Sequence, residues 1–142
     1  MQPDHSLKIC DWPEAEARVM PLRVRVFVEE QGVPAEIERD ALDAVCRHAI
    51  ARDAGGRVIA TGRLLPDGHI GRMAVLRTAR GAGVGGAVLQ ALIAEAARRG
   101  LPEVALNAQT HALAFYLRHG FEAVGEVFME AGIPHRAMRR TV

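Results

Sequence analysis

The glycine-rich residues 80–86 are the part of the sequence whose composition most clearly indicates chemistry. They read Arg-Gly-Ala-Gly-Val-Gly-Gly, and four glycines in the last six positions let the backbone turn tightly and approach a ligand without a Cβ in the way. A helix is predicted to begin near Val84, so the N–H groups of its first turn face the same ligand from the positive end of the helix dipole. Arg77 and Arg80 add charged donors at the edge. The segment therefore predicts a binding site for a phosphate or a pyrophosphate.

Other interpretations of these glycines are weaker. A plain connector that packs a helix tightly against a sheet would also be rich in glycine. Gly81, Gly83 and Gly86 match the G-x-G-x-x-G pattern of dinucleotide-binding folds, but that pattern follows the first strand of repeated βαβ units and needs an acidic residue about twenty positions later. Residues 107–109, after the next strand, contain no acid. The Gly-Lys-Ser/Thr sequence of nucleotide hydrolases is absent as well.

The predicted elements place this segment after an antiparallel meander. The predicted strands are residues 7–12, 48–52, 57–65, 69–75, 103–107, 121–129 and 135–140. The predicted helices are residues 14–19, 22–30, 84–99 and 110–118. Apolar residues at three- and four-residue steps mark the third helix: Val84, Val88, Leu89, Leu92, Ile93 and Ala96. Turn residues at 53–56 and 66–68 join the second, third and fourth strands into the meander. Pro21 is expected in the first turn of the second helix, where its missing N–H costs nothing, and residues 33–43 are expected to form a loop with about one helical turn. The order β-α-α-β-β-β-α-β-α-β-β predicts one α/β domain over residues 1–142, with helices on both faces of a mixed, mostly antiparallel sheet of about seven strands.

Composition and charge exclude several classes of protein. The formal net charge of +1 provides no broad positive field for nucleic acid or an anionic membrane. Cys10 and Cys46 are too few and too far apart for a disulfide scaffold or a metal site, and the histidines are too scattered to hold a metal. The sequence has no run of signal-peptide or membrane-spanning character, so a cytoplasmic protein is expected.

Two motifs at suitable spacing resemble those of the GCN5-related N-acetyltransferases, the GNAT superfamily. Arg-x-x-Gly-x-Gly at residues 80–85 is similar to their pyrophosphate-binding motif, and Arg-Met-Ala-Val at residues 72–75 is similar to their cofactor-binding strand. Residues 109–121 resemble their second signature, a helix with Ala and Tyr that ends in Gly-Phe. Residues 22–31 and the Gly-Ile-Pro-His segment at residues 132–135 resemble the ElaA and YjcF-like branch. The resemblance covers nearly the whole chain.

This resemblance implies transfer of an acetyl group from acetyl-CoA to a primary amine by direct attack in a ternary complex, without a metal. The residues implied to bind coenzyme A are Met73, Ala74, Val75, Arg80, Gly81, Ala82, Gly83, Val84, Gly85, Gly86, Gln109 and Tyr116. Gln109 stands where many members have asparagine. Backbone groups of Met73 and Val75 would pair with the pantetheine amides, and the N–H of Val75 would polarise the thioester carbonyl. Tyr116 would protonate the departing thiolate.

The sequence motifs indicate the acceptor-binding residues less specifically than the cofactor-binding residues. Glu30, at the end of a helix that should line the acceptor cleft, is the candidate general base, although Glu29 and Glu30 would also suit a solvated helix end. The candidates for the acceptor pocket are Gln31, His111, Glu130 and His135. The acidic residues 29–43 favour a cationic acceptor, a small-molecule amine or a lysine side chain. Neither a nucleic acid nor a membrane partner is expected. Many members of the family dimerise, so a homodimer is among the implied assemblies, although no segment marks an interface.

Two other functions remain open at this point. A coenzyme A-binding module without catalysis, acting as a sensor, would share the glycine-rich loop but need neither an acid nor a base. Release of a free thiol from the thioester distinguishes it from an enzyme. A nucleotide-binding fold would bind NAD or ATP instead.

Overall fold

The computed structural model describes residues 5–35 and 40–142. Its strands are β1 (His5–Cys10), β2 (Arg47–Asp53), β3 (Val58–Leu64), β4 (Ile70–Val75), β5 (Glu103–Gln109), β6 (Glu122–Glu130) and β7 (Ile133–Thr141). Its α-helices are α1 (Trp12–Arg23), α3 (Val84–Arg98) and α4 (Leu113–Arg118). Short helical turns occur at η1 (Val24–Glu30), η2 (Ala41–Val45), η3 (Arg77–Ala79) and η4 (Thr110–Ala112). None of the helices in these ranges is long and apolar enough to cross a membrane.

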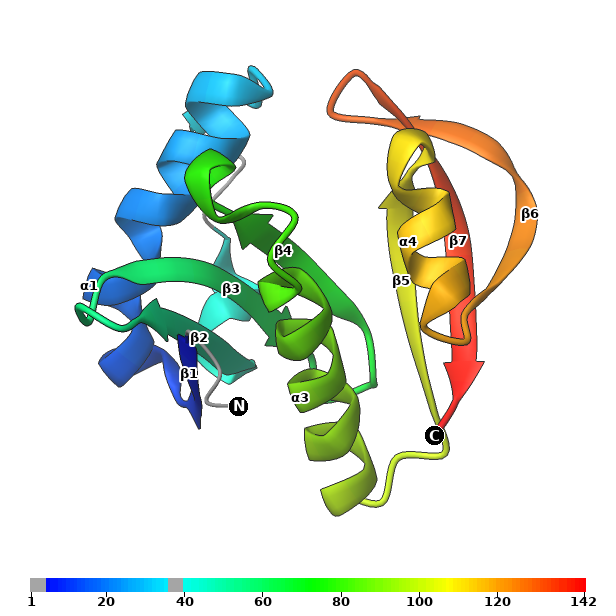
Figure 1. Cartoon of the computed structure of the whole chain (residues 1–142). Coiled ribbons are helices and arrows are strands. Elements are labelled where there is room, and N and C mark those ends of the chain that lie inside the picture. Colours follow the sequence, from blue (N-terminus) through cyan, green and yellow to red (C-terminus); the bar gives the residue numbers. More distant parts are fainter. Residues whose placement is uncertain (1–4, 36–39) are drawn as a thin grey trace.

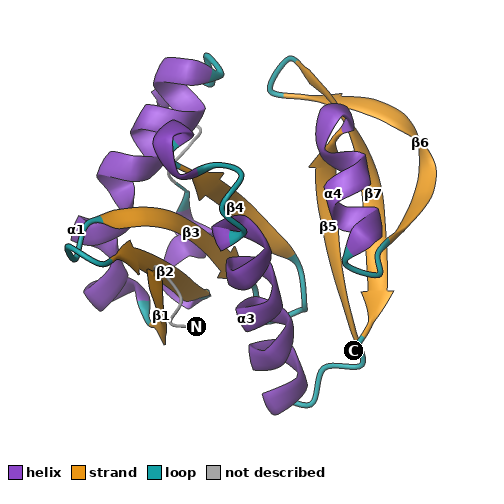
Figure 2. Ribbon diagram, in the orientation of Figure 1, coloured by secondary structure: helices purple, strands orange, loops and turns teal. Residues whose placement is uncertain are grey.

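The predicted α/β fold class is confirmed, but the strands form two antiparallel sheets instead of one mixed sheet. The first sheet has the order β1-β2-β3-β4 and the second the order β5-β7-β6. The two sheets meet at a single parallel bridge between His69 and Ala105, where the Ala105 N–H donates to the carbonyl of Gly68 at 3.1 Å. Beyond this bridge β4 and β5 diverge, so no strand of the described residues pairs with this edge of β4 (Figures 1 and 2).

A β-bulge bends β4 close to the point of divergence. The register shifts between residues 61 and 63 of β3, so that Arg72 and Met73 of β4 stand opposite the single residue Gly62. Arg72 has a φ of 50°, which is uncommon for a residue with a side chain. A bulge increases the local twist and re-aims the side chains beside it. The bulged residues lie just beyond the bridge at His69, where β4 and β5 diverge.

The first helical region corrects the predicted break at Pro21. Helix α1 runs through Pro21 without interruption and is followed directly by the π-type turns of η1. In those turns the N–H of Gln31 donates to the carbonyl of Val26, five residues earlier. Proline removes one helical hydrogen bond, and the chain here continues as a helix and widens its turns afterwards. Of the loop predicted at residues 33–43, residues 36–39 lie outside the described residues, and η2 supplies a helical turn.

Helices α1 and α3 cover opposite faces of the first sheet (Figure 1). Ile50 of β2 packs with Ala15 and Val19 of α1, whereas its neighbours Ala49 and Ala51 belong to the larger core that contains the apolar face of α3. Neighbouring residues of a strand point to opposite faces, which explains this division. The buried residues of α3 in that core are those predicted from helical spacing: Val84, Val88, Leu89, Leu92, Ile93 and Ala96.

A buried ion network ties α1, η2 and β3 together. Asp43 is 1% exposed and accepts hydrogen bonds from Arg23 at 2.9 Å and from Arg63 at 2.8 Å. Arg63 also donates to Asp40 at 2.7 Å. Charges this deeply buried persist only when they are paired and hydrogen-bonded. The network holds η2 against the strand that lies next to β4.

Candidate active site

A cavity of about 1570 Å³ lies between the free edge of β4 and the second sheet, and it takes in nearly all of the predicted site residues. Its wall includes the glycine-rich loop, the start of α3, the end of η1, and parts of β5, α4 and the β6–β7 turn. The predicted residues that line it are Glu30, Gln31, Met73, Ala74, Val75, Arg80, Gly81, Gly83, Val84, Gly85, Gly86, Gln109, His111, Tyr116, Glu130 and His135. Ala82 is the exception: it lies in the loop, exposed, and does not line the cavity.

The glycine-rich loop uses its glycines in two different ways. Gly81 and Gly83 have φ values of +85° and +83°, and Gly83 is the N-cap of α3. Side chains are strained in this left-handed region. Gly85 and Gly86 stand where space is tight: an added Cβ would lie 3.3 Å from a Val75 methyl at Gly85 and 3.1 Å from the His119 ring at Gly86. The loop thus brings the first-turn N–H groups of α3, which have no partner inside the helix, to the cavity wall.

The edge of β4 presents backbone groups to the cavity. The N–H of Leu76 donates to the carbonyl of Ile59 on β3 at 2.9 Å. Backbone groups alternate in direction along an antiparallel strand, so those of Val75 point to the other edge. The Val75 carbonyl indeed accepts a hydrogen bond from Arg80 Nε at 3.0 Å. A ligand in the cavity can therefore pair with this edge as an added strand would.

Glu30 lies close to two arginines, Arg80 at the start of the glycine-rich loop and Arg77 in η3. Its two carboxylate oxygens accept hydrogen bonds from Nη2 of Arg80 at 3.1 and 2.9 Å, and Arg77 Nη2 is 3.9 Å from Oε2. Arg80 therefore links the end of η1 to the end of β4. The carboxylate predicted as a general base is engaged by the same guanidinium that was predicted to bind phosphate.

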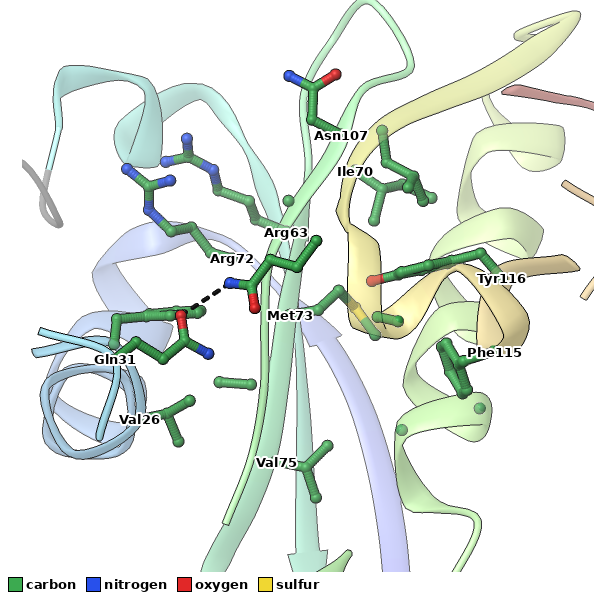
Figure 3. A pocket seen from close by; sticks show the side chains of 18 of the residues that line it. Val26, Gln31, Arg63, Ile70, Arg72, Met73, Val75, Asn107, Phe115 and Tyr116 are labelled. Carbon is green, nitrogen blue, oxygen red and sulfur yellow. Dashed lines mark hydrogen bonds between the residues drawn. The ribbon is translucent and has the colours of Figure 1, made fainter. Parts of the chain in front are cut away.

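Tyr116 reaches the cavity from α4, and Figure 3 shows its hydroxyl pointing inward toward the side of Met73. Its ring packs edge-on against Phe115 and Phe121, with centroids 5.0 and 5.9 Å away. Burial raises the pKa of Tyr116 to about 12, because the phenolate would lose its hydration. The hydroxyl therefore carries its proton at neutral pH.

A chain of polar side chains crosses the cavity between η1 and β5. The Gln109 amide nitrogen donates to the Gln31 carbonyl oxygen at 2.8 Å, a bond drawn in Figure 3. The Gln109 carbonyl oxygen lies 2.6 Å from His111 Nε2, which donates because the amide oxygen only accepts. Three of the predicted residues are thus brought together, although Gln31 and Gln109 are 78 positions apart in the sequence.

The β6–β7 turn carries the two remaining predicted residues. Nε2 of His135 lies 3.5 Å from Oε2 of Glu130, and Nδ1 of His135 lies 2.7 Å from the carbonyl oxygen of Ile133. Asn107 of β5 donates to Oε1 of Glu130 at 3.3 Å. His135 is 5% exposed, whereas the side chain of Glu130 is 50% exposed. A buried imidazole and a carboxylate therefore stand together on the cavity wall.

Several cavity residues were missed at the level of sequence. Arg63 and Arg72 line the wall with their side chains next to each other (Figure 3), and both donate to Asp40. Arg63 stands in a strand of otherwise small or uncharged residues, which was the available sign of a buried charge. Nothing in the sequence indicated that Asn107 lines the cavity, because a single amide side chain in a strand is common. Within residues 5–35 and 40–142, no group of three or more His, Cys, Asp or Glu side chains is placed to hold a metal ion.

Comparisons with known proteins agree with this geometry. The acetyltransferase (GNAT) domain family matches residues 14–142. An uncharacterised N-acetyltransferase of Bacillus subtilis, YjcF, is 42% identical over 123 residues, which cover 84% of this chain and 87% of that protein. The crystal structure of an acyl-CoA N-acyltransferase from Pseudomonas aeruginosa is 36% identical with a TM-score of 0.85, and the match covers 96% of this chain and 99% of that one. The crystal structure of Escherichia coli ElaA gives 28% identity, a TM-score of 0.85 and the same two coverages. The chain therefore belongs to the GNAT acetyltransferase superfamily and is of the ElaA and YjcF type.

Proposed function

We propose that this chain transfers an acetyl group from acetyl-CoA to the nitrogen of a primary amine, by direct attack in a ternary complex. The observation that carries the proposal is that one cavity joins a glycine-rich helix start, a free strand edge and a protonated tyrosine. These three features suit a pyrophosphate, a pantetheine arm and a leaving thiolate in turn. Membership of the family supports N-acyl transfer from an acyl-CoA in general.

The cofactor would extend from the loop along β4. The N–H groups of residues 81–86 and the guanidinium of Arg80 would hold the pyrophosphate. Backbone groups of Met73 and Val75 would pair with the pantetheine amides. The outward N–H of Val75 would donate to the thioester carbonyl and stabilise the oxyanion that forms during attack.

The chemistry then needs one proton removed and one supplied. The acceptor ammonium, with an ordinary pKa near 10, loses a proton before its nitrogen attacks the thioester carbon. The carbon–sulfur bond breaks as the tetrahedral intermediate collapses, and Tyr116 donates its proton to the thiolate. The second proton released by the nitrogen restores the Tyr116 hydroxyl. The products are the N-acetyl amine, free coenzyme A and one proton.

Calorimetric titration with acetyl-CoA, desulfo-CoA and NAD tests the binding part of this proposal. We expect both CoA compounds to bind and NAD not to bind. Gly85→Val should weaken acetyl-CoA binding at least tenfold, because its side chain would enter the contact with Val75 at the cavity wall. Gly55→Val, in the β2–β3 turn with only an ordinary contact to Asp53, is the control and should bind normally. Failure of the unaltered protein to bind either CoA compound would refute the proposal.

Thiol release from acetyl-CoA in the presence of amines tests the catalytic part. We expect release that depends on the amine. Tight binding of acetyl-CoA without any amine-dependent release would instead indicate the non-catalytic coenzyme A-binding module, the alternative function for such a fold.

A further inference from the structure

The cavity contains two carboxylates among the residues that the structure describes, and only one is placed to receive a cation. Glu30 is held by Arg80 at 2.9 Å and faces Arg77. Glu130 has an amide donor, Asn107, and an imidazole, His135, as its partners. An ammonium ion placed at Glu30 would meet two guanidinium groups, which repel it. At Glu130 it would meet a half-exposed carboxylate.

The imidazole beside Glu130 has a defined orientation. Its Nδ1 must carry a hydrogen, because the Ile133 carbonyl 2.7 Å away can only accept. Nε2 therefore carries the free lone pair of the ring, and it is the nitrogen that faces Glu130. Phe128 stacks on the ring with centroids 6.0 Å apart and an interplanar angle of 25°. The position of the His135 ring and its tautomer are thus both fixed by neighbouring residues.

The β6–β7 hairpin places both groups on the same side. Glu130 pairs with Ile133 and Phe128 pairs with His135, so these four side chains share one face of the hairpin. Gln109 pairs with His135 on the neighbouring strand β5. That face lines the cavity at Glu130, Ile133 and His135.

No arginine competes for this pair in the part of the chain that the structure describes. The groups that face His135 are Glu130 and Phe128 from β6 and Gln109 from β5. The adjacent cation, Arg136, donates both of its hydrogen bonds to the carbonyl of Gly125 and is thus directed elsewhere. A positive ligand can therefore approach Glu130 without displacing an internal ion pair.

We propose that Glu130 and His135 form the acceptor site, which takes the ammonium group of a small aliphatic amine, and that Nε2 of His135 accepts its proton. This inference rests on the proposed function and specifies its acceptor and its base. The ammonium first pairs with Glu130. One N–H bond then breaks as its proton passes to Nε2, leaving a neutral amine to attack the thioester and an imidazolium stabilised by Glu130. The imidazolium afterwards releases this proton to solvent.

The binding step is tested without turnover. The protein saturated with desulfo-CoA is titrated with putrescine, spermidine and glucosamine in a calorimeter. We expect at least one amine to bind, and Glu130→Gln to weaken that binding at least tenfold. Glu126→Gln removes a charge from the same strand outside the cavity and should change the dissociation constant less than twofold. If no amine binds, or if Glu130→Gln binds as the unaltered protein does, the inference is wrong.

The proton-transfer step is tested with His135→Asn. The asparagine amide can still donate to the Ile133 carbonyl, but it provides no group that accepts a proton in place of Nε2. We expect kcat at pH 7 to fall about 10²-fold, the usual effect of losing a general base, with acetyl-CoA affinity unchanged. The loss should shrink as the pH approaches the pKa of the amine, because the free amine needs no base. A merely structural role would not produce this recovery.

Glu30→Gln separates the two candidate bases. We expect it to change acetyl-CoA affinity through Arg80, without the recovery of kcat at high pH that His135→Asn should show. A large fall in kcat at unchanged acetyl-CoA affinity would assign the base to Glu30 and overturn the role of His135. The proposed function fails on different evidence, namely absence of acetyl-CoA binding or of thiol release.

Discussion

The surroundings of the Tyr116 ring on α4 raise the pKa of its hydroxyl. Its ring is enclosed by Phe115 and Phe121, and burial raises its pKa to about 12. An acid with a raised pKa keeps its proton below that value, so the hydroxyl stays able to donate across the whole neutral and mildly alkaline range. An ordinary thiol has a pKa near 8.5, so transfer of the Tyr116 proton to the thiolate is unfavourable by about 3.5 pKa units and depends on the proton that the acceptor nitrogen returns to the hydroxyl.

Replacement of Tyr116 by Phe tests this role directly. The variant keeps the aromatic packing and loses only the hydroxyl, so we expect kcat to fall about 10²-fold while the dissociation constant for acetyl-CoA stays within about twofold. Steady-state kinetics and calorimetry measure the two quantities. Thermal unfolding at an unchanged midpoint would show that the fold is intact. A kcat equal to that of the unaltered protein would remove Tyr116 from the mechanism.

At the level of the elements, the short turn before β4 creates the space for a ligand. The carbonyl of Gly68 accepts a hydrogen bond from Ala105, and this contact joins the two sheets at one end. Beyond it lies the bulge at Arg72, in the part of β4 that lines the cavity. The cavity thus begins beside one close contact and one irregular strand.

Gly68→Ala should therefore be costly. A Cβ at this position would lie 2.7 Å from the carbonyl oxygen of Glu103, and the backbone has a φ of +99°. We expect a loss of about 3 kcal/mol or more in the free energy of unfolding. Gly56→Ala is the matched control, since its φ is +86° but its Cβ would meet nothing within 4 Å. It should lose only about 1 kcal/mol, the cost of the left-handed backbone alone. Equal losses in urea unfolding would contradict the steric argument.

At the scale of the whole molecule, buried charges make stability depend on pH. Hydrogen bonds from Arg63 lower the pKa of Asp40, and those from Arg98 and Arg99 lower the pKa of Glu95 to about 2. Burial alone would raise the pKa of Asp43, but Arg23 and Arg63 outweigh it and lower the value. Burial lowers the pKa of His48. In every case the unfolded chain binds protons more readily than the folded chain.

We expect stability to fall as the pH is lowered from 7. The contribution of neutral His48 is complete above its unfolded pKa of about 6.5 and is lost as the pH falls toward its lower folded value. The carboxylate contribution is complete above about pH 4.5 and is lost toward pH 2, where Glu95 takes up its proton. Thermal unfolding midpoints at pH 7, 5.5 and 3 measure both steps. Glu95→Gln should reduce the lower step, and midpoints that do not change with pH would contradict the argument.

Local patterns in the sequence were sufficient for most of the elements. The spacing of apolar residues located α3 and its buried face, and turn residues near 53–56 and 66–68 located the meander of β2, β3 and β4. The glycine-rich loop was also evident, because a helix start and the need for glycine are properties of a few adjacent residues. These features, with the helix that ends in Gly-Phe, were enough to indicate the family.

The tertiary structure decided which of these residues meet. The sequence by itself indicated the family, the fold class and the glycine-rich loop. The pairing of Glu30 with Arg80, the bond of Gln31 to Gln109 and the division into two sheets required the fold. Pro21 likewise did not separate two helices: α1 continues through it to Arg23, and the wider turns of η1 follow. Arg80 is 50 positions from Glu30, and no local period carries information over that distance. Such contacts depend on strand register and on the angle between the sheets, which are set by the packing of the whole chain.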